Sequence, residues 1–380
     1  MKQQFEAKAS AVPFLDLSLS YQQIQEEVES AVIRLMRSGK YILGAEVAEL
    51  ETRIAAYCQT DFAIGVASGS DALLVAMLAL GIQPGDEVIT TPFTFFATAG
   101  SIARLGATPI FVDIDPGTFN LIPEQVQQKV TTKTKAIMPV HLFGQCAEMN
   151  ALTAIAREHG LAVIEDAAQA IGATYGGKRA GSLGDLGCFS FFPTKNLGCM
   201  GDAGIITTNN AELADLCLRL RVHGSVPGNA YYYDLVGCNS RIDTMQAAIL
   251  LVKLKYLDEW HEARRKNAAL YDTLLADVEQ VNTPLIAENC QSVYNQYSLV
   301  VEKRDQLRAY LSEHDIASAI YYPLPLSLQE CFKDCGCRAG DYPNAEYAAK
   351  HIVSLPIYPG LSEEMIERVA LTIRRFYQEQ

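Results

Sequence analysis

A lysine and an aspartate each follow an apolar run of this sequence. Lys195 lies just beyond the run at 188–192, and Asp166 lies just beyond the run at 161–164. If both runs are strands of one α/β sheet, the amine can form a Schiff base and the carboxylate can hold a protonated ring nitrogen. Pyridoxal phosphate chemistry requires both groups. The pair therefore predicts this cofactor, with Lys195 and Asp166 as the catalytic residues.

Each of these side chains also has a simpler explanation. Lys195 can be a solvated charge in a glycine-containing loop, and Asp166 can be the N-cap of a following helix. Gln169, one helical turn after Asp166, either contacts the ring hydroxyl or is a surface amide. The hydroxyl groups of Ser190 and Thr194 close to Lys195 favour a ligand site over an isolated loop charge.

A candidate phosphate site precedes a helical pattern that starts near Ser70. Ser68, Gly69 and Ser70 form a turn whose free N–H groups, together with the helix dipole, favour a phosphate. Many helices begin with such a turn, so the signal gains weight only from the nearby lysine and aspartate. Phe95, at an expected strand–helix junction, either stacks on a flat ring or fills the core.

A polar segment at 237–243 precedes another helical pattern. It either caps that helix or gathers donors for a phosphate or a substrate anion. Arg241 in this segment is a candidate for binding the carboxylate of an amino donor, with an interface salt bridge as the alternative. His223 is a candidate neighbour of the substrate, or a loop histidine without a ligand.

Apolar runs and helical patterns alternate along residues 60–225. This alternation predicts a doubly wound, mostly parallel sheet, in which ligands bind beyond the carboxyl ends of the strands. A long helical pattern from 244 leads into a second unit. We therefore expect a large α/β domain at 1–250 and a small α+β domain at 251–380. The expected buried strands are 62–66, 87–90, 109–112, 135–140, 161–164, 188–192 and 204–207.

The composition is that of a soluble protein with a sizeable core, with 49% hydrophobic and 20% charged residues. A formal net charge of -13 disfavours binding to nucleic acid and to anionic membranes. No apolar run reaches the roughly 18 residues of a membrane span, and no signal peptide is visible, so we expect a cytoplasmic location without membrane insertion. The ten cysteines include no Cys-x-x-Cys pair, so no metal site is predicted.

Taken together, these residues resemble the DegT/StrS family of sugar aminotransferases, which have the aspartate aminotransferase fold (fold type I of pyridoxal phosphate enzymes). The resemblance extends from about Phe14 to the C-terminal helix. It is most specific in the segments 41–44, 67–73, 140–144, 164–169, 189–195 and 239–243.

The resemblance implies a role for each matching residue. Lys195 resembles the Schiff-base lysine and proton shuttle, Asp166 the partner of the pyridine nitrogen, and Gln169 the contact to the ring hydroxyl. Phe95 matches the aromatic residue that stacks on the ring. The residues matching the phosphate cradle are Ser68, Gly69, Ser70 and Ser190. Asn239 would reach the phosphate of the neighbouring subunit, which implies a homodimer with shared active sites.

Within the family, the chain is similar to members that use L-glutamate to aminate UDP-linked 2-acetamido-3-keto sugars for cell-surface polysaccharide or lipid A. Tyr321 stands where the glucuronate-specific members are expected to carry histidine, and a phenol suits a neutral glucose substrate at least as well. A dTDP-linked 3- or 4-keto-6-deoxy sugar remains an alternative. The expected substrate-binding residues are Tyr41, His223, Arg241, Tyr321 and Tyr322.

Three other functions are alternatives to this hypothesis. A dehydratase of the same fold carries histidine in place of the lysine, so Lys195 argues against it. A non-catalytic regulator that binds pyridoxal phosphate is a rival of a different class. A nicotinamide dehydrogenase is disfavoured, because no Gly-x-Gly-x-x-Gly motif follows the first expected strand.

Overall fold

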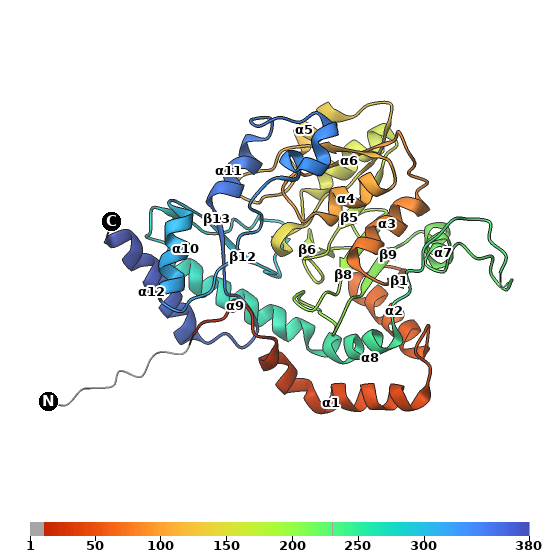
Figure 1. Cartoon of the computed structure of the whole chain (residues 1–380), viewed down its shortest axis with the longest axis horizontal. Helices are drawn as coiled ribbons and strands as arrows, with labels where there is room; N and C mark the ends of the chain where they lie inside the picture. Colours follow the sequence, from red (N-terminus) through yellow and green to blue (C-terminus); the bar gives the residue numbers. More distant parts are fainter. Residues whose placement is uncertain (1–10, 230, 380) are drawn as a thin grey trace.

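The main sheet of the protein has seven strands. The computed structural model describes residues 11–229 and 231–379. Strand β9 runs antiparallel to both of its neighbours, and every other neighbouring pair is parallel. The α/β fold with a mostly parallel sheet is therefore confirmed (Figure 1). The spatial order is β1 (Phe62–Val66), β9 (Gly204–Thr208), β8 (Leu186–Ser190), β5 (Ala162–Asp166), β4 (Thr134–Ile137), β2 (Glu87–Thr90) and β3 (Thr108–Phe111).

Helices cover both faces of this sheet. Successive residues of one strand enter different apolar cores, as Ile205 and Ile206 of β9 do. Burial on both faces explains why the strands are continuous apolar runs in the sequence. The core on one face includes residues of α3 (Gly69–Ala79), α4 (Ala97–Arg104) and α7 (Ala211–Leu220). The other includes residues of α2 (Ala45–Cys58), α5 (Pro123–Lys129), α6 (Met149–His159) and α8 (Thr244–Lys253).

The C-terminal part has a core and a sheet of its own. A 3₁₀ turn, η2 (Leu254–Tyr256), joins α8 to the long helix α9 (Leu257–Leu275), so the single helical pattern expected from 244 is interrupted. The sheet has the order β10 (Val281–Asn282), β12 (Tyr297–Val301) and β13 (Ile352–Leu355). Helices α10 (Arg304–Glu313) and α12 (Glu363–Gln378) share its apolar core with α9. Division of the chain near residue 250 stays a prediction.

Further elements complete the fold. Strand β11 (Cys290–Gln291) pairs with the hairpin of β6 (Thr174–Tyr175) and β7 (Lys178–Arg179). Helix α1 (Leu17–Ser38) packs against α8 at the lower edge of Figure 1. The remaining elements are α11 (Pro343–His351) and the 3₁₀ turns η1 (Leu142–Gly144), η3 (Leu326–Leu328) and η4 (Glu330–Cys335).

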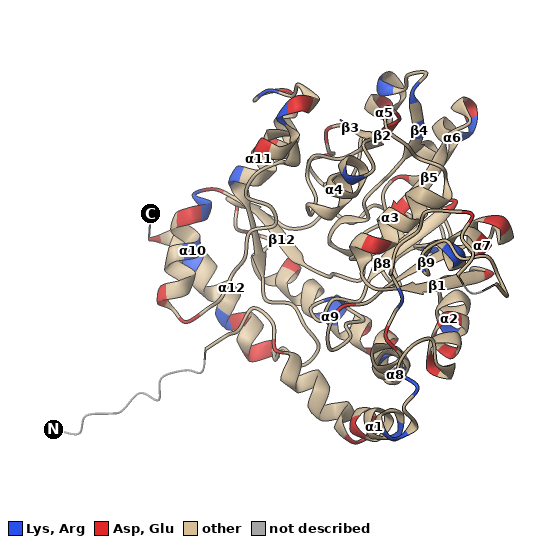
Figure 2. Cartoon of the chain, turned by 45° about the vertical axis from the view of Figure 1, so that its right-hand side comes forward, with Lys and Arg blue, Asp and Glu red and all other residues tan. Residues whose placement is uncertain are grey.

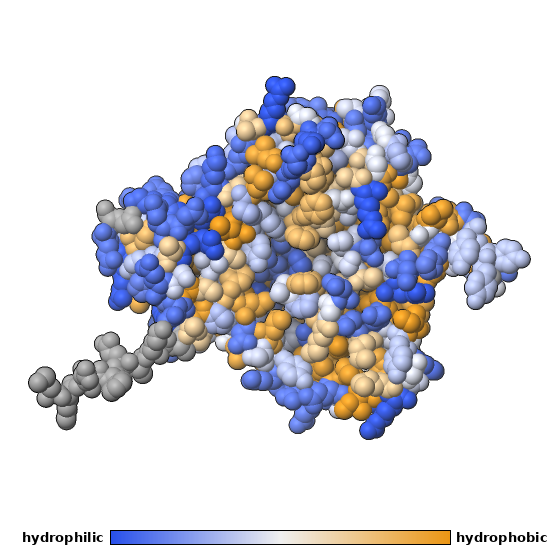
Figure 3. Space-filling model, viewed as in Figure 1, coloured by the Kyte–Doolittle hydropathy of each residue, from blue (hydrophilic) through white to orange (hydrophobic). Residues whose placement is uncertain are grey.

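The surface carries charges of both signs. Figure 2 shows acidic and basic residues interspersed over the outer helices, whereas the central strands are largely free of charge. Apolar side chains interrupt the polar surface over the end of α1 and the start of α2 (Figure 3). Within the described ranges, none of the helices combines the length and the hydropathy that a membrane span requires.

Candidate active site

Two neighbouring parallel strands bring Lys195 and Asp166 to one edge of the sheet. Asp166 is the last residue of β5 and pairs with Cys188 of β8, and Lys195 lies in the loop that follows β8. The carboxyl ends of parallel strands meet at one edge, which is where α/β folds bind ligands. The charges of the two side chains interact strongly enough to shift each other's pKa. The two predicted catalytic residues therefore share one site.

Lys195 lies in a partly buried, weakly hydrated position. Loss of hydration lowers the pKa of its amine from 10.5 to about 8, and the nearby carboxylate of Asp166 opposes this shift. An amine with this pKa is partly neutral near neutral pH, and the neutral form is the nucleophile that attacks an aldehyde. Because the lysine is not fully solvated, its interpretation as an ordinary loop charge is wrong.

Asp166 is buried at the end of β5. Burial raises the pKa of its carboxyl group, while hydrogen bonds from Thr98 and from the Ala168 backbone lower it. The Thr98 hydroxyl donates to Oδ2 at 2.7 Å, and the Ala168 N–H donates to Oδ1 at 3.2 Å. Turns and not a helix follow Asp166, so the helix-capping explanation is wrong. A cationic ring nitrogen would suit this carboxylate.

Gln169 lies beside Asp166, with its amide oxygen already bonded. The Phe143 N–H donates to Oε1 at 2.7 Å, and Nε2 donates to the Tyr322 hydroxyl at 3.2 Å. An amide nitrogen has two hydrogens, so one remains to bond a ring hydroxyl or its oxyanion. Tyr322, which is a predicted substrate contact, therefore lies beside Gln169 and close to Asp166. Its neighbour Tyr321 is half-buried against the ring of Phe14, with ring centroids 6.1 Å apart.

The predicted phosphate cradle lies where β1, β8 and β9 meet. Ser68 is the N-cap of α3 and accepts the Asp71 N–H, so the helix begins at Gly69, one residue before its expected start near Ser70. A side chain at position 69 would place its Cβ 2.6 Å from the Cβ of Ser190. Gly69 is therefore required for the close approach of the α3 N-terminus to Ser190, while Ser70 is exposed on the first turn. Unpaired N–H groups of a first helical turn suit a phosphate.

Phe95 lies just before α4 and is 59% exposed. Core filling is therefore the wrong explanation of this aromatic residue, whose open ring remains available for stacking. One turn later, Thr98 bonds Asp166, as described above, and also lies 3.1 Å from the Thr94 hydroxyl. Thr98 was not among the residues predicted from the sequence. Its position three residues after Phe95 was the available signal.

Four predicted residues form a second group on the surface near the start of α8. The Arg241 guanidinium donates to Asn239 Oδ1 at 2.6 Å, and a backbone bridge joins Asn239 to Val222, the residue before His223. Tyr41 is exposed, and its carbonyl accepts the Thr244 N–H at the first turn of α8. None of the described contacts of this group reaches Lys195 or Asp166. The segment nevertheless adjoins the phosphate cradle, because the Ser240 hydroxyl accepts the Ala67 N–H at 3.2 Å.

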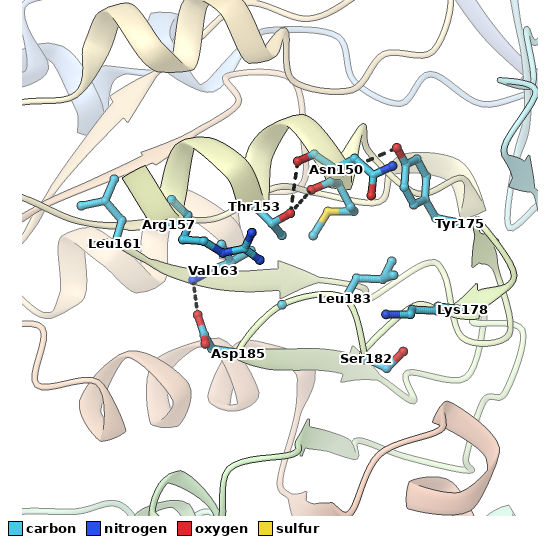
Figure 4. Close-up of a pocket in the computed structure, with 14 residues that line it drawn as sticks. Asn150, Thr153, Arg157, Leu161, Val163, Tyr175, Lys178, Ser182, Leu183 and Asp185 are labelled. Atoms are coloured by element: carbon cyan, nitrogen blue, oxygen red, sulfur yellow. Dashed lines mark hydrogen bonds between the residues drawn. The ribbon is translucent and has the colours of Figure 1, made fainter. Parts of the chain in front are cut away.

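The largest described cavity, about 620 Å³, lies elsewhere. Figure 4 shows that it opens between α6, β5 and the loop before β8, lined by Arg157, Lys178 and Asp185 among others. None of the predicted site residues lines it. The candidate active site therefore rests on the chemistry of its side chains and not on cavity size. The described ranges contain no cluster of acidic, histidine and cysteine side chains arranged to hold a metal.

Comparison with protein families gives a match over residues 22–374 to the DegT/DnrJ/EryC1/StrS aminotransferase family. The chain belongs to this family. It is 54% identical to the pleiotropic regulatory protein of Geobacillus stearothermophilus, over 97% of this chain and 99% of that protein. It is 43% identical to the UDP-2-acetamido-2-deoxy-3-oxo-D-glucuronate aminotransferase of Pseudomonas aeruginosa, over 95% of this chain and 99% of that protein. A third relative, 41% identical over 96% and 98%, is the UDP-N-acetyl-3-dehydro-alpha-D-glucosamine 3-aminotransferase of Acidithiobacillus ferrooxidans.

Solved structures of family members agree with this assignment. The crystal structure of S. venezuelae DesV with a ketimine intermediate superposes with a TM-score of 0.94 at 40% identity, over 97% of this chain and 99% of that chain. NtdA of Bacillus subtilis, solved with the cofactor PMP, gives a TM-score of 0.91 at 32% identity, over 99% and 87%. The predicted family, fold and pyridoxal phosphate cofactor are therefore confirmed.

Replacing Thr98 by valine tests the hydroxyl that supports Asp166. We expect the Kd of pyridoxal phosphate to rise roughly 10- to 100-fold, because a hydrogen bond to a charged group is worth about 1.5–3 kcal/mol. Equilibrium titration of the apoenzyme, followed by absorbance, measures this Kd. Thr90→Val is a matched control, since the Thr90 hydroxyl is equally buried but donates to the Met138 carbonyl. Equal effects of the two substitutions would contradict the role of Thr98.

The lowered pKa of Lys195 predicts the pH dependence of cofactor capture. Only the neutral amine attacks, so the rate constant for apoenzyme and pyridoxal phosphate should rise with pH and reach half its maximum near the amine pKa of about 8. Stopped-flow absorbance at constant ionic strength measures this rate. A midpoint near 10.5, the ordinary value, would show that Lys195 is fully hydrated.

Proposed function

We propose that this protein is an active aminotransferase that moves an amino group from L-glutamate to a nucleotide-linked keto sugar. The observation that carries the proposal is the pairing of Lys195, with a pKa near 8, and the buried carboxylate of Asp166 at one sheet edge. Pyridoxal phosphate supplies an aldehyde that condenses with amines and a ring that accepts the electron pair released at the amine α-carbon. The protein residues bind, orient and protonate around it.

Each predicted residue around Lys195 and Asp166 has a distinct task in this proposal. Lys195 would hold the cofactor covalently and would accept the proton of the amino-donor α-carbon. Asp166 would favour the protonated form of the ring nitrogen, and Gln169 could donate its free N–H to the ring hydroxyl. Phe95 would stack on the ring. Ser68, Gly69, Ser70 and Ser190 would hold the phosphate.

The substrate that we propose is a UDP-linked 2-acetamido-3-oxo sugar, glucose or glucuronate. Two relatives, at 43% and 41% identity, are named for such substrates. Tyr321 offers a phenol and no cation, which suits a neutral hydroxymethyl at least as well as a carboxylate. Tyr322, Tyr41, His223 and Arg241 are the other proposed substrate contacts. We place the reaction in the cytoplasm, in cell-surface polysaccharide or lipid A synthesis.

Two alternatives remain. A dTDP-linked keto-6-deoxy sugar is supported by a relative in Streptomyces venezuelae, 40% identical, that is named dTDP-3-amino-3,4,6-trideoxy-alpha-D-glucose transaminase. A non-catalytic regulator is suggested by the name of the Geobacillus relative. The buried carboxylate of Asp166 favours turnover, because a protonated ring nitrogen serves to accept electrons released at a substrate carbon, which binding alone does not need.

An assay with the holoenzyme separates these alternatives. L-glutamate alone should convert the cofactor to its amine form, which changes its absorbance, and a non-catalytic binder would show no change. A panel of UDP- and dTDP-linked keto sugars then gives the acceptor, with the new amine located by NMR. Lys195→Ala should lose turnover and the absorbance of the covalently held cofactor, while the exposed Lys178→Ala control keeps both. Turnover by the Lys195→Ala variant would refute the assignment.

We also propose a homodimer in which Asn239 completes the active site of the partner. The second group, which consists of Tyr41, His223, Asn239 and Arg241, has no described contact with Lys195. In a dimer, a second copy of the chain would place this group beside the Lys195 of its partner. The loop after α7 is unusually apolar for a surface, with Tyr231 88%, Tyr232 66% and Val236 92% exposed. Exposed aromatic patches of this kind mark protein interfaces.

Mixing two defective variants tests whether active sites are shared. Lys195→Ala and Asn239→Asp homodimers should each have little activity, the second because its added charge repels the phosphate. After denaturation and refolding of an equal mixture, each hybrid has one intact site, so about a quarter of the wild-type activity should return. No recovery, despite hybrid dimers detected by native mass spectrometry, would refute a shared site.

A further inference from the structure

A buried glutamate and a buried histidine lie directly behind the residues that face the cofactor. Glu165 precedes Asp166 in β5, so their side chains leave opposite faces of the sheet. The His141 Nε2 and Glu165 Oε2 atoms are 2.9 Å apart, and neither side chain is exposed to solvent. The proposed chemistry gives no task to either residue. A buried glutamate that takes no part in a reaction requires another explanation.

Four hydrogen-bond donors surround the Glu165 carboxylate. The N–H groups of Leu183 and Gly184 donate to Oε1, each at 2.7 Å. The Gly181 N–H donates to Oε2 at 2.7 Å, and His141 occupies the remaining side of that oxygen. All four partners are hydrogen-bond donors. This environment therefore suits an ionised carboxylate, which only accepts hydrogen bonds, and does not suit a group that carries a hydrogen of its own.

The histidine has a defined tautomer. The Ala147 N–H donates to Nδ1 of His141 at 3.1 Å, so Nε2 carries the hydrogen and donates it to Glu165. Both ring nitrogens are thereby bonded. The pair is a fixed bridge between the loop 181–184 and the segment 141–147, and it has no free atom for proton transfer.

The bridged segment 141–147 in turn holds two cofactor-facing residues. The backbone N–H of His141 donates to the Asp166 carbonyl at 2.9 Å. Two residues later, the backbone N–H of Phe143 donates to Gln169 Oε1 at 2.7 Å. A shift of this segment would therefore move the main chain of Asp166 and the amide of Gln169 together.

The same segment also reaches the loop of Lys195. The Phe143 carbonyl accepts the Asn295 N–H at 2.9 Å, and the Asn295 side chain donates to Asn196 Oδ1 at 2.6 Å. Asn196 is the residue after Lys195, and its own amide donates to the Val293 carbonyl at 2.8 Å. Contacts that begin at Glu165 thus extend to Asp166, to Gln169 and to Asn196 beside Lys195.

We propose that Glu165 and His141 are positioning residues, which lock the 141–144 turn and thereby orient Asp166, Gln169 and the Lys195 loop toward the cofactor. This role rests on the proposed function of those three residues. The pair touches neither cofactor nor substrate. It acts through backbone groups, as partners behind a metal ligand do when they fix the ligand's orientation.

The Glu165→Gln variant tests the positioning role of Glu165 with the smallest change of side-chain shape. Whichever way the new amide is turned, its NH₂ group faces at least two N–H donors, so the segment must move. The Kd of pyridoxal phosphate should rise about tenfold or more, and kcat should fall while the KM for L-glutamate changes little. The absorbance of bound cofactor should shift at saturation, because Asp166 and Gln169 meet the ring in altered positions.

Asp185→Asn is the matched control. Figure 4 shows Asp185 bonded to Val163 of the same strand, where its Oδ2 accepts the backbone N–H at 2.8 Å. This substitution is also a carboxylate-to-amide change against β5, but the asparagine oxygen can still accept the bond and its NH₂ group can turn to solvent. We expect a wild-type Kd and spectrum. An effect as large as that of Glu165→Gln would show that the lock is not specific.

Hydrogen exchange of the wild-type protein gives a test that needs no variant. If the Glu165–His141 pair orients the cofactor site, binding of pyridoxal phosphate must stabilise the contacts of this pair by the same free energy. Exchange at the amides of Leu183, Gly184 and Phe143 should therefore slow when the apoenzyme is loaded. Unchanged exchange at full occupancy, or a Glu165→Gln variant with wild-type Kd and spectrum, would overturn the positioning role alone. A wild-type apoenzyme that binds no pyridoxal phosphate would overturn the proposed function and this role with it.

Discussion

The burial of the Asp166 carboxylate is the interaction on which the site depends. A carboxylate loses hydration when it is buried, and its charged form persists only if donors or a cation replace the lost water. The hydroxyl of Thr98, the N–H of Ala168 and the charge of Lys195 do this in part, and the pKa of Asp166 is still raised. The protonated ring nitrogen of pyridoxal phosphate would supply a further cation beside this carboxylate.

The same lack of water acts in the opposite direction on the lysine. Desolvation disfavours both charged forms, so it raises the pKa of Asp166 and lowers that of Lys195. Parallel pairing of β5 with β8 brings both groups to one place, since both strands end at the same edge of the sheet. Poor hydration at this edge of the sheet therefore accounts for both features. It leaves the Asp166 carboxylate suited to a cationic ring nitrogen, and it leaves the Lys195 amine able to attack an aldehyde.

Much of this was predictable from the sequence, for identifiable reasons. Strands buried on both faces are continuous apolar runs, so 87–90 and 204–207 were placed within a residue of β2 and β9. Contacts between distant segments were not predictable. The hydroxyl of Thr98 meets Asp166 across 68 positions, and Gln169 meets Tyr322 across 153. The Glu165–His141 pair was missed because both residues lie in apolar surroundings where the sequence gives no sign of a partner.

The central claim is a covalent bond between the cofactor and one lysine, and chemical trapping tests it most directly. Borohydride reduces the carbon–nitrogen double bond to a stable amine, and peptide mass spectrometry then locates the added mass. We predict modification of Lys195 alone. Lys253 is the informative competitor, because burial lowers the pKa of its amine as well. Label on Lys253, or no label on a protein that is saturated with pyridoxal phosphate, would contradict the account.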